Sequence, residues 1–166
     1  FWGYRQTRKR TRKEDCGIPW IILFDPTSAC NLKCTGCWAS EYERALNLSF
    51  EDMDRIVTEG KQLDIREYVM TGGEPTMRWD DIVKLAEKHS DCGFLLFTNG
   101  TLIQQKHCDD MLAAKNILLS ISIEGGEEAT DSRRGKGTFK RIVSAMDLLK
   151  KNGIAYGTSI CYTSAN

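Results

Sequence analysis

The run Cys30-Asn31-Leu32-Lys33-Cys34-Thr35-Gly36-Cys37 spaces three cysteines by gaps of three and then two residues, directly after an apolar stretch at residues 20–24. Thiolates this close together can point into one small volume, and this arrangement favours a metal centre. A structural zinc site takes four protein ligands, and the common ferredoxin run has another order of gaps and a fourth cysteine. Three cysteines therefore leave one iron of a cubane cluster without a protein ligand, and catalytic metal sites keep such an open position.

Outward from this run, short apolar stretches alternate with segments of helical periodicity. The stretches that predict strands are residues 20–24, 67–70, 94–97, 117–123 and 154–162, and those that predict helices are 50–63, 79–86, 103–114 and 139–149. Alternation of strands and helices is typical of βαβ units with a parallel sheet. The first strand is continuously apolar, so we expect it to be covered on both faces.

Polar and glycine-rich stretches stand at the ends of the later strands. Gly72-Gly73-Glu74-Pro75 follows the second, and two glycines let the backbone approach a ligand closely with N–H and C=O groups free to bind it; a simple tight turn is the alternative. Thr98-Asn99-Gly100 follows the third and contains a common turn signal. In the fourth, Ser120 and Ser122 fall on the face opposite the isoleucines, which indicates a polar cavity on that side.

The cysteine run and these stretches, followed by Ser122-Ile123-Glu124-Gly125 and residues 131–139, resemble in order the motifs of the radical S-adenosylmethionine (radical SAM) enzymes. The resemblance covers roughly residues 20–166 and is greatest to the branch that often carries a SPASM or twitch extension. It implies an α/β fold, an open partial TIM-like barrel of βα units with about five strands present. Family members have six such units, so we expect residues 16–166 to form a core domain that is incomplete at its C-terminus and has an exposed strand edge.

The resemblance also implies a chemistry. Cys30, Cys34 and Cys37 would hold a [4Fe-4S] cluster whose fourth iron is chelated by S-adenosylmethionine. Reductive cleavage of S-adenosylmethionine would then generate a 5′-deoxyadenosyl radical that abstracts hydrogen from an unknown substrate, which is a peptide, a metabolite or a cofactor precursor. An electron donor such as flavodoxin or ferredoxin is the implied partner.

By the same resemblance, further residues form a cradle for S-adenosylmethionine. The implied contacts are Gly72, Gly73 and Glu74 to the amino group, Asn99 near the cofactor, Ser122 and Glu124 to the ribose or the methionine end, and Arg134 to the carboxylate. The family often has an aromatic residue before the last cysteine, where this chain has Gly36, so Trp38 is expected to substitute near the adenine; a place in the core is the alternative for Trp38. For Arg133 we expect surface ion pairs with Glu127, Glu128 or Asp131.

The composition bounds the class of protein. A chain of 166 residues is about one domain long, and 23 basic against 23 acidic residues leave no net charge to attract nucleic acid or an anionic membrane. No apolar run is long enough to span a bilayer and no signal peptide is apparent, so we expect a cytoplasmic protein. Residues 1–15 carry six cations and are expected to form a basic, solvated N-terminal arm rather than a surface for nucleic acid or lipid.

Four further cysteines lie outside the run from Cys30 to Cys37. Cys16, Cys92, Cys108 and Cys161 are scattered singly, and we expect them to be small buried apolar residues, with Cys16 near the cluster as an alternative.

A non-catalytic iron–sulfur or zinc-binding module would explain the three clustered cysteines but not the other motifs. A flavodoxin-like or other doubly wound binding domain would need a phosphate-binding glycine fingerprint after the first strand, which is absent.

Overall fold

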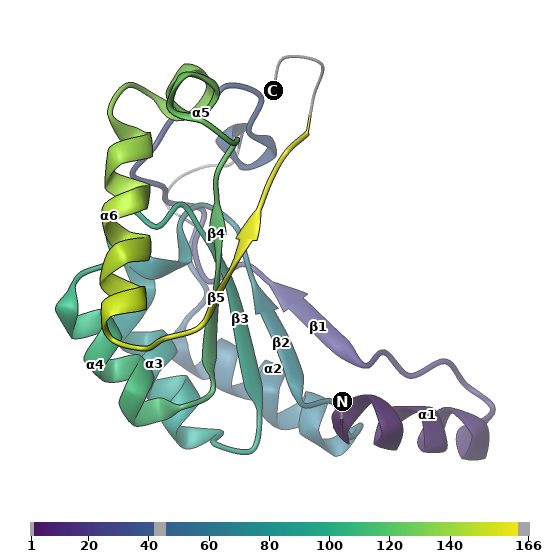
Figure 1. The fold of residues 1–166 in the computed structure, drawn as a ribbon. Helices are drawn as coiled ribbons and strands as arrows, with labels where there is room; N and C mark the ends of the chain where they lie inside the picture. Colours follow the sequence, from purple (N-terminus) through teal and green to yellow (C-terminus); the bar gives the residue numbers. More distant parts are fainter. Residues whose placement is uncertain (1, 42–45, 163–166) are drawn as a thin grey trace.

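The computed structural model describes residues 2–41 and 46–162 and contains one five-stranded sheet (Figure 1). All neighbouring strands pair in parallel, in the order β1-β2-β3-β4-β5. The strands are β1 (Ile21–Phe24), β2 (Glu67–Met70), β3 (Gly93–Thr98), β4 (Ile117–Ser122) and β5 (Tyr156–Ser159). The order follows the chain, so each strand lies beside the next and the sheet stays open, which confirms the predicted α/β partial barrel.

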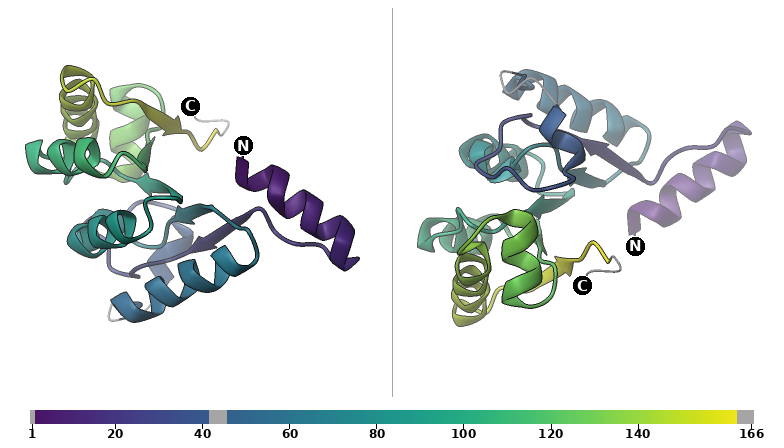
Figure 2. Two further views of the ribbon diagram at one scale, coloured as in Figure 1. Left: turned by 90° about the horizontal axis from the view of Figure 1, so that it is seen from below. Right: turned by 90° about the horizontal axis from the view of Figure 1, so that it is seen from above.

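Four long helices cover one face of the sheet. They are α2 (Phe50–Gln62), α3 (Trp79–Lys88), α4 (Gln105–Ala114) and α6 (Thr138–Lys151) (Figures 1 and 2). Helix α2 begins where the sequence predicts, because the side chain of Ser49 accepts a hydrogen bond of 3.0 Å from the N–H of Asp52. The core between helices and sheet includes Met70, Leu96 and Leu119, all fully buried.

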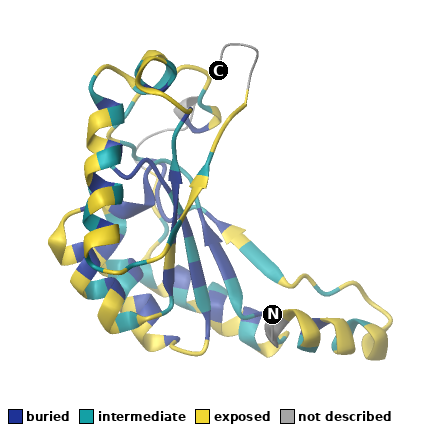
Figure 3. Ribbon diagram, in the orientation of Figure 1, coloured by how far each residue is buried: buried dark blue, intermediate teal, exposed yellow. Residues whose placement is uncertain are grey.

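The first strand differs from its prediction. Leu23 is 61% exposed and Trp20, just before the strand, is 49% exposed, so β1 is not covered on both faces (Figure 3). The reason is that the helices cover one face of the sheet, and in the described part of the chain β1 pairs with a neighbour on one side alone.

The last strand is shorter than predicted. Strand β5 ends at Ser159, whereas the apolar pattern predicted a strand through residue 162. Strand β4 ends at Ser122, and beyond this point the N–H of Cys161 donates to the side chain of Glu124 at 3.2 Å instead of to a strand partner. Among the described residues β5 is the second edge of the sheet, as expected.

A short helix lies between residues 125 and 137, where the apolar pattern of the sequence predicts none. Helix α5 (Glu127–Arg134) has Glu127 and Glu128 in its first turn and Arg133 and Arg134 in its last. This order of charges complements the helix dipole, and it was a signal for a helix that a prediction from apolar periodicity does not use. Two 3-10 helices, η1 (Trp38–Glu41) and η2 (Pro75–Arg78), follow the cysteine run and the Gly72-Gly73-Glu74 stretch.

The basic N-terminal segment forms helix α1 (Trp2–Glu14), which lies apart from the other helices on the side of the sheet that they leave open (Figure 2). Five cations face solvent along it, at positions 5, 8, 9, 12 and 13. It is attached through Arg10, which donates to the carbonyl of Gln62 and pairs with Asp64 at 3.6 Å. Phe1 lies outside the described residues. Within the described ranges, no helix combines the length and the apolar character that crossing a bilayer requires.

Leu96→Ala tests the packing of the core. Leu96 lies on the central strand and is fully buried, so we expect the substitution to lower the free energy of unfolding by about 2–5 kcal/mol in urea denaturation. Leu112→Ala on α4, where Leu112 is 49% exposed, is the control and should change it by less than about 0.5 kcal/mol. Equal effects of the two substitutions would contradict this arrangement of the core.

Candidate functional site

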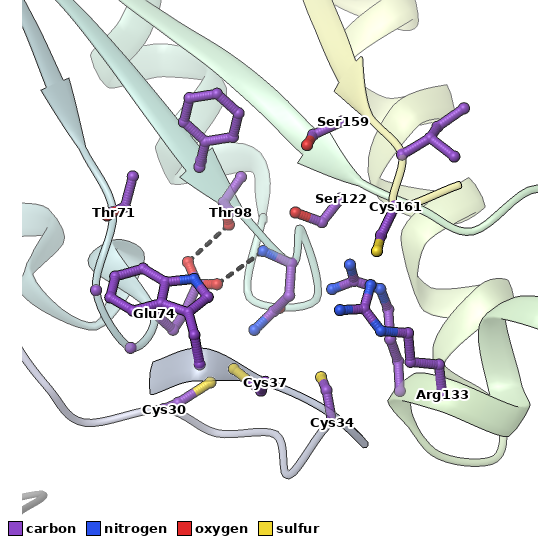
Figure 4. Close-up of a pocket in the computed structure, with 17 residues that line it drawn as sticks. Cys30, Cys34, Cys37, Thr71, Glu74, Thr98, Ser122, Arg133, Ser159 and Cys161 are labelled. Atoms are coloured by element: carbon purple, nitrogen blue, oxygen red, sulfur yellow. Dashed lines mark hydrogen bonds between the residues drawn. The ribbon is translucent and has the colours of Figure 1, made fainter. Parts of the chain in front are cut away.

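A cavity of about 360 Å³ opens at the carboxyl ends of the strands (Figure 4). All the site residues predicted from the sequence line it, with the exception of Glu124: Cys30, Cys34, Cys37, Trp38, Gly72, Gly73, Glu74, Asn99, Ser122 and Arg134. These residues come from segments far apart in the sequence, and the parallel sheet brings them together because its strands all end at the same edge.

The three cysteines lie along the loop after β1, and each of their thiols borders the cavity. None of them is in a disulfide. Burial raises the pKa of Cys34, and the positive charge of Arg134 opposes this rise. In the described part of the chain, no three Cys, His, Asp or Glu side chains are gathered closely enough to hold a single metal ion. The thiols instead share a larger space.

The turn Gly72-Gly73-Glu74 holds the first half of the cysteine loop. The N–H of Gly73 donates to the carbonyl of Thr27 at 2.9 Å, and the N–H of Glu74 donates to the carbonyl of Ala29 at 2.7 Å. A Cβ atom at Gly73 would overlap the carbonyl groups of Ser28 and Ala29, so only glycine permits this approach. The expectation that the N–H groups of this turn are free to bind a ligand is therefore wrong for Gly73 and Glu74, because the loop occupies them.

Glu74 is a buried carboxylate, 1% exposed, with four hydrogen-bond donors. Its Oε1 accepts from the N–H and the hydroxyl of Thr76 at 3.1 and 2.5 Å. Its Oε1 also accepts from the hydroxyl of Thr98 at 2.6 Å, and its Oε2 accepts from the N–H of Asn99 at 2.8 Å (Figure 4). Burial raises the pKa of Glu74, and these hydrogen bonds oppose the rise because they favour the ionised form. The carboxylate thereby joins the ends of β2 and β3.

Asn99 connects the end of β3 to the cysteine loop. Its side-chain amide donates to Oδ1 of Asn31 at 2.8 Å, and its own Oδ1 accepts from the N–H and the hydroxyl of Thr101 at 2.9 and 2.6 Å. The amide of Asn31 in turn donates to the hydroxyl of Thr101 at 2.9 Å. Asn99 is 6% exposed, and its hydrogen bond to Asn31 holds the loop at the residue after Cys30.

The second half of the cysteine loop is held from the opposite side by Arg133. The backbone carbonyl of Arg133 accepts from the N–H of Thr35 at 2.8 Å, and its Nε donates to the carbonyl of Thr35 at 3.3 Å. Its Nη1 pairs with Glu124. The expected surface pairs with Glu127, Glu128 or Asp131 are therefore wrong, because the last turn of α5 aims this side chain at the site.

Glu124 lies behind the two arginines and does not border the cavity. Its side chain is 1% exposed, and its Oε1 accepts from Nε and Nη2 of Arg134 at 2.9 and 2.5 Å. Burial alone would raise the pKa of Glu124, but the hydrogen bonds and charges of Arg134 and then Arg133 outweigh it and lower the pKa. Arg134 borders the cavity, and Glu124, which was expected to contact a ribose or methionine group, does not.

Some residues of the cavity wall were not predicted from the sequence. They are Thr71, Phe97, Thr98, Arg133, Ser159, Ile160 and Cys161. With the exception of Arg133, which lies in the last turn of α5, these residues stand at strand ends, and that position was the available signal. Trp38 borders the cavity and is 59% exposed, so it is not a core residue.

The four single cysteines divide into two pairs. Cys92 and Cys108 are buried, as expected, whereas Cys16 and Cys161 are exposed. Cys16 is exposed and does not border the cavity, so neither the expected buried position nor the alternative place near the cysteine loop is supported. Cys161 does border the cavity, because it follows the end of β5.

Comparison with known proteins gives concordant matches. The Radical SAM superfamily profile matches residues 24–163. The mycofactocin maturase MftC of Mycolicibacterium smegmatis is 32% identical over 139 residues, which are 81% of this chain and 35% of that protein. The Fe-coproporphyrin III synthase of Methanosarcina barkeri is 30% identical over 156 residues, 88% of this chain and 38% of that protein.

Among solved structures, native anSMEcpe with bound AdoMet is similar, with a TM-score of 0.71, 26% identity, and coverage of 84% of this chain and 43% of that one. The same protein has also been solved with AdoMet and the peptide Cp18Cys. The chain thus spans 35% to 43% of the length of these relatives.

Gly73→Ala tests the contact between the turn and the cysteine loop. Because the added methyl group would overlap two backbone carbonyls, we expect the free energy of unfolding to fall by about 1–3 kcal/mol in urea denaturation. Gly17→Ala is the control, since a Cβ atom there meets nothing within 4 Å. A Gly73→Ala protein as stable as the control would show that the loop does not pack on this turn.

Glu74→Gln tests the buried carboxylate. Both carboxylate oxygens of Glu74 accept hydrogen bonds, and glutamine replaces one of them with an NH₂ group, which cannot accept from the donor that faces it. We therefore expect the free energy of unfolding at pH 7 to fall by about 1.5–3 kcal/mol. Glu67→Gln, at the start of β2 and only half-buried, is the matched control and should have little effect. Similar losses for both variants would argue against a structural role of Glu74.

Proposed function

Because this chain belongs to the radical SAM superfamily, we propose that it forms the core of an enzyme that binds a [4Fe-4S] cluster and S-adenosylmethionine. The observation that carries the proposal is that Cys30, Cys34 and Cys37 line the same cavity as residues from the ends of four strands. A zinc module would not require the further motifs to meet at the same place as the three thiols.

The residues that line the cavity fit a [4Fe-4S] cluster and S-adenosylmethionine. Three thiols that share one space, without a fourth from the same loop, suit a cluster with one iron left open. Burial raises the pKa of Cys34, and the positive charge of Arg134 opposes this rise and so acts in favour of the thiolate, the form that ligates iron. When bound in this family, the cluster and S-adenosylmethionine together supply a 5′-deoxyadenosyl radical for hydrogen abstraction.

The chain's own residues would orient S-adenosylmethionine. The amino group of S-adenosylmethionine is an ammonium, which needs hydrogen-bond acceptors. The N–H groups of Gly73 and Glu74 are donors and already bind the cysteine loop. We therefore assign the binding of this ammonium to the carbonyl oxygens of the Gly72-Gly73-Glu74 turn. We assign the carboxylate to Arg134, whose guanidinium can form paired hydrogen bonds. Ser122 and Asn99 are proposed as polar contacts, and the exposed ring of Trp38 as the surface for the adenine.

We propose a peptide as the substrate class. Support comes from the anSMEcpe structure with a bound peptide and from a PqqA peptide cyclase of Bradyrhizobium diazoefficiens that is 28% identical over 130 residues. A porphyrin, as the name of the Methanosarcina barkeri relative indicates for that protein, is the alternative. Flavodoxin or ferredoxin is the proposed electron donor. None of the seven cysteines is in a disulfide, which fits the reducing cytoplasm as the proposed location.

Electron paramagnetic resonance tests the proposal. The chain is reconstituted anaerobically with iron and sulfide, reduced, and measured at low temperature with and without S-adenosylmethionine. We expect the signal of a reduced [4Fe-4S] cluster that changes when S-adenosylmethionine is added, because the open iron gains a ligand.

Two cysteine variants provide the control. Cys34→Ser should lose most of the bound iron, whereas Cys16→Ser, which changes an exposed thiol away from the cavity, should retain it. A spectrum that does not respond to S-adenosylmethionine, or tight binding of zinc in place of iron, would contradict the proposal and favour a non-catalytic metal module.

A further inference from the structure

Glu124 is a buried carboxylate on which two separate segments converge, α5 and the residues after β5. Its carboxylate accepts from the side chains of Arg133 and Arg134 on α5 and, through Oε2, from the N–H of Cys161 beyond β5 at 3.2 Å. Glu124 itself follows the end of β4. The carboxylate therefore fixes α5 and the exit of β5 relative to the centre of the sheet.

Arg133 extends these contacts to the cysteine loop. It binds Thr35 twice, through its backbone carbonyl and through Nε, and Thr35 is the neighbour of Cys34. Cys30, by contrast, lies next to Ala29 and Asn31, which are bound by Glu74 and Asn99. The Cys34 half of the loop is thus attached through Arg133 to the carboxylate of Glu124, whereas the Cys30 half is attached to the backbone N–H of Glu74 and the side chain of Asn99.

We propose that Glu124 is a positioning residue that holds the Cys34 half of the cysteine loop through Arg133. It acts behind the cavity wall and does not contact the cofactor. The inference rests on the proposed function only in treating Cys34 as a cluster ligand, since the contacts themselves involve no bound group.

The charges explain why the loop depends on this carboxylate. Two guanidinium groups from consecutive residues point at one oxygen of Glu124, and without its negative charge they would repel each other. The side chain of Arg133 is 28% exposed and that of Arg134 12% exposed. Arg133 is therefore the one that would turn toward solvent and release its Nε from Thr35.

Thiol labelling of the metal-free chain tests the proposal without any cofactor. The reduced protein is treated briefly with iodoacetamide, and the modification of each cysteine is measured by mass spectrometry. In Glu124→Gln we expect the ratio of Cys34 to Cys30 labelling to rise roughly tenfold, because charge-assisted hydrogen bonds that restrain one half of the loop are lost. Glu127 lies on α5, the helix of Arg133, and forms an exposed ion pair with Lys140 of α6. Glu127→Gln removes this pair and should leave the labelling ratio unchanged.

Arg133→Gln separates positioning from general destabilisation. It leaves Glu124 paired with Arg134 and should raise the same ratio by a similar factor, and the double variant should add little. Should Glu124→Gln fail to fold, Arg133→Gln decides the matter alone. An unchanged labelling ratio in a folded Arg133→Gln protein would overturn the proposal.

A spectroscopic measurement distinguishes positioning from direct cofactor contact. After reconstitution, we expect the cluster signal of Glu124→Gln to differ from that of the unchanged chain and of Glu127→Gln already in the absence of S-adenosylmethionine. Weaker binding of S-adenosylmethionine with unaltered labelling and an unaltered cofactor-free signal would show that Glu124 contacts the cofactor, and would overturn the proposal. Failure of the chain to bind any cluster would contradict the proposed function but would leave the labelling result intact.

Discussion

The site depends on one close backbone contact, in which the turn after β2 packs against the loop after β1. The loop carbonyls of Thr27 and Ala29 accept hydrogen bonds from two successive N–H groups of the turn, and the absence of a side chain at Gly73 lets the two backbones meet. A loop that carries three cysteines has little apolar surface of its own to bury. Its position is therefore set by hydrogen bonds to the sheet ends, which are rigid because the core below them is packed.

Two buried carboxylates also hold the strand ends together through hydrogen bonds. Glu74 and Glu124 follow the ends of β2 and β4, and both are almost fully removed from solvent. Neither would be stable there without donors, and each gathers them from several segments, so the cost of burying a charge is offset only when the strand ends and the loop have the observed arrangement. The charged groups thereby contribute specificity to the geometry of the site, which a purely apolar contact would define less sharply.

Much of the fold and of the site was predictable. The strand β2 and the start of α2 follow from local patterns, and the periodicity of the helices placed them correctly to within a few residues. Helix α5 was missed because its signal is a distribution of charge, from Glu127 to Arg134, and not an apolar stripe. The exposure of Leu23 was missed because an apolar run does not reveal whether both faces of its strand are covered.

The sequence by itself determined the order of strands and helices, the family resemblance and most of the predicted residues that gather around the three cysteines, because spacing and order along the chain encode these features. Only the tertiary structure decided the roles of Glu124 and Arg133. Their partners, Arg134, Thr35 and Cys161, lie up to 98 residues away in the chain, and whether a carboxylate faces a cavity or a guanidinium depends on how α5 packs over the end of β4. Contacts between distant segments arise from packing, and local sequence does not specify them.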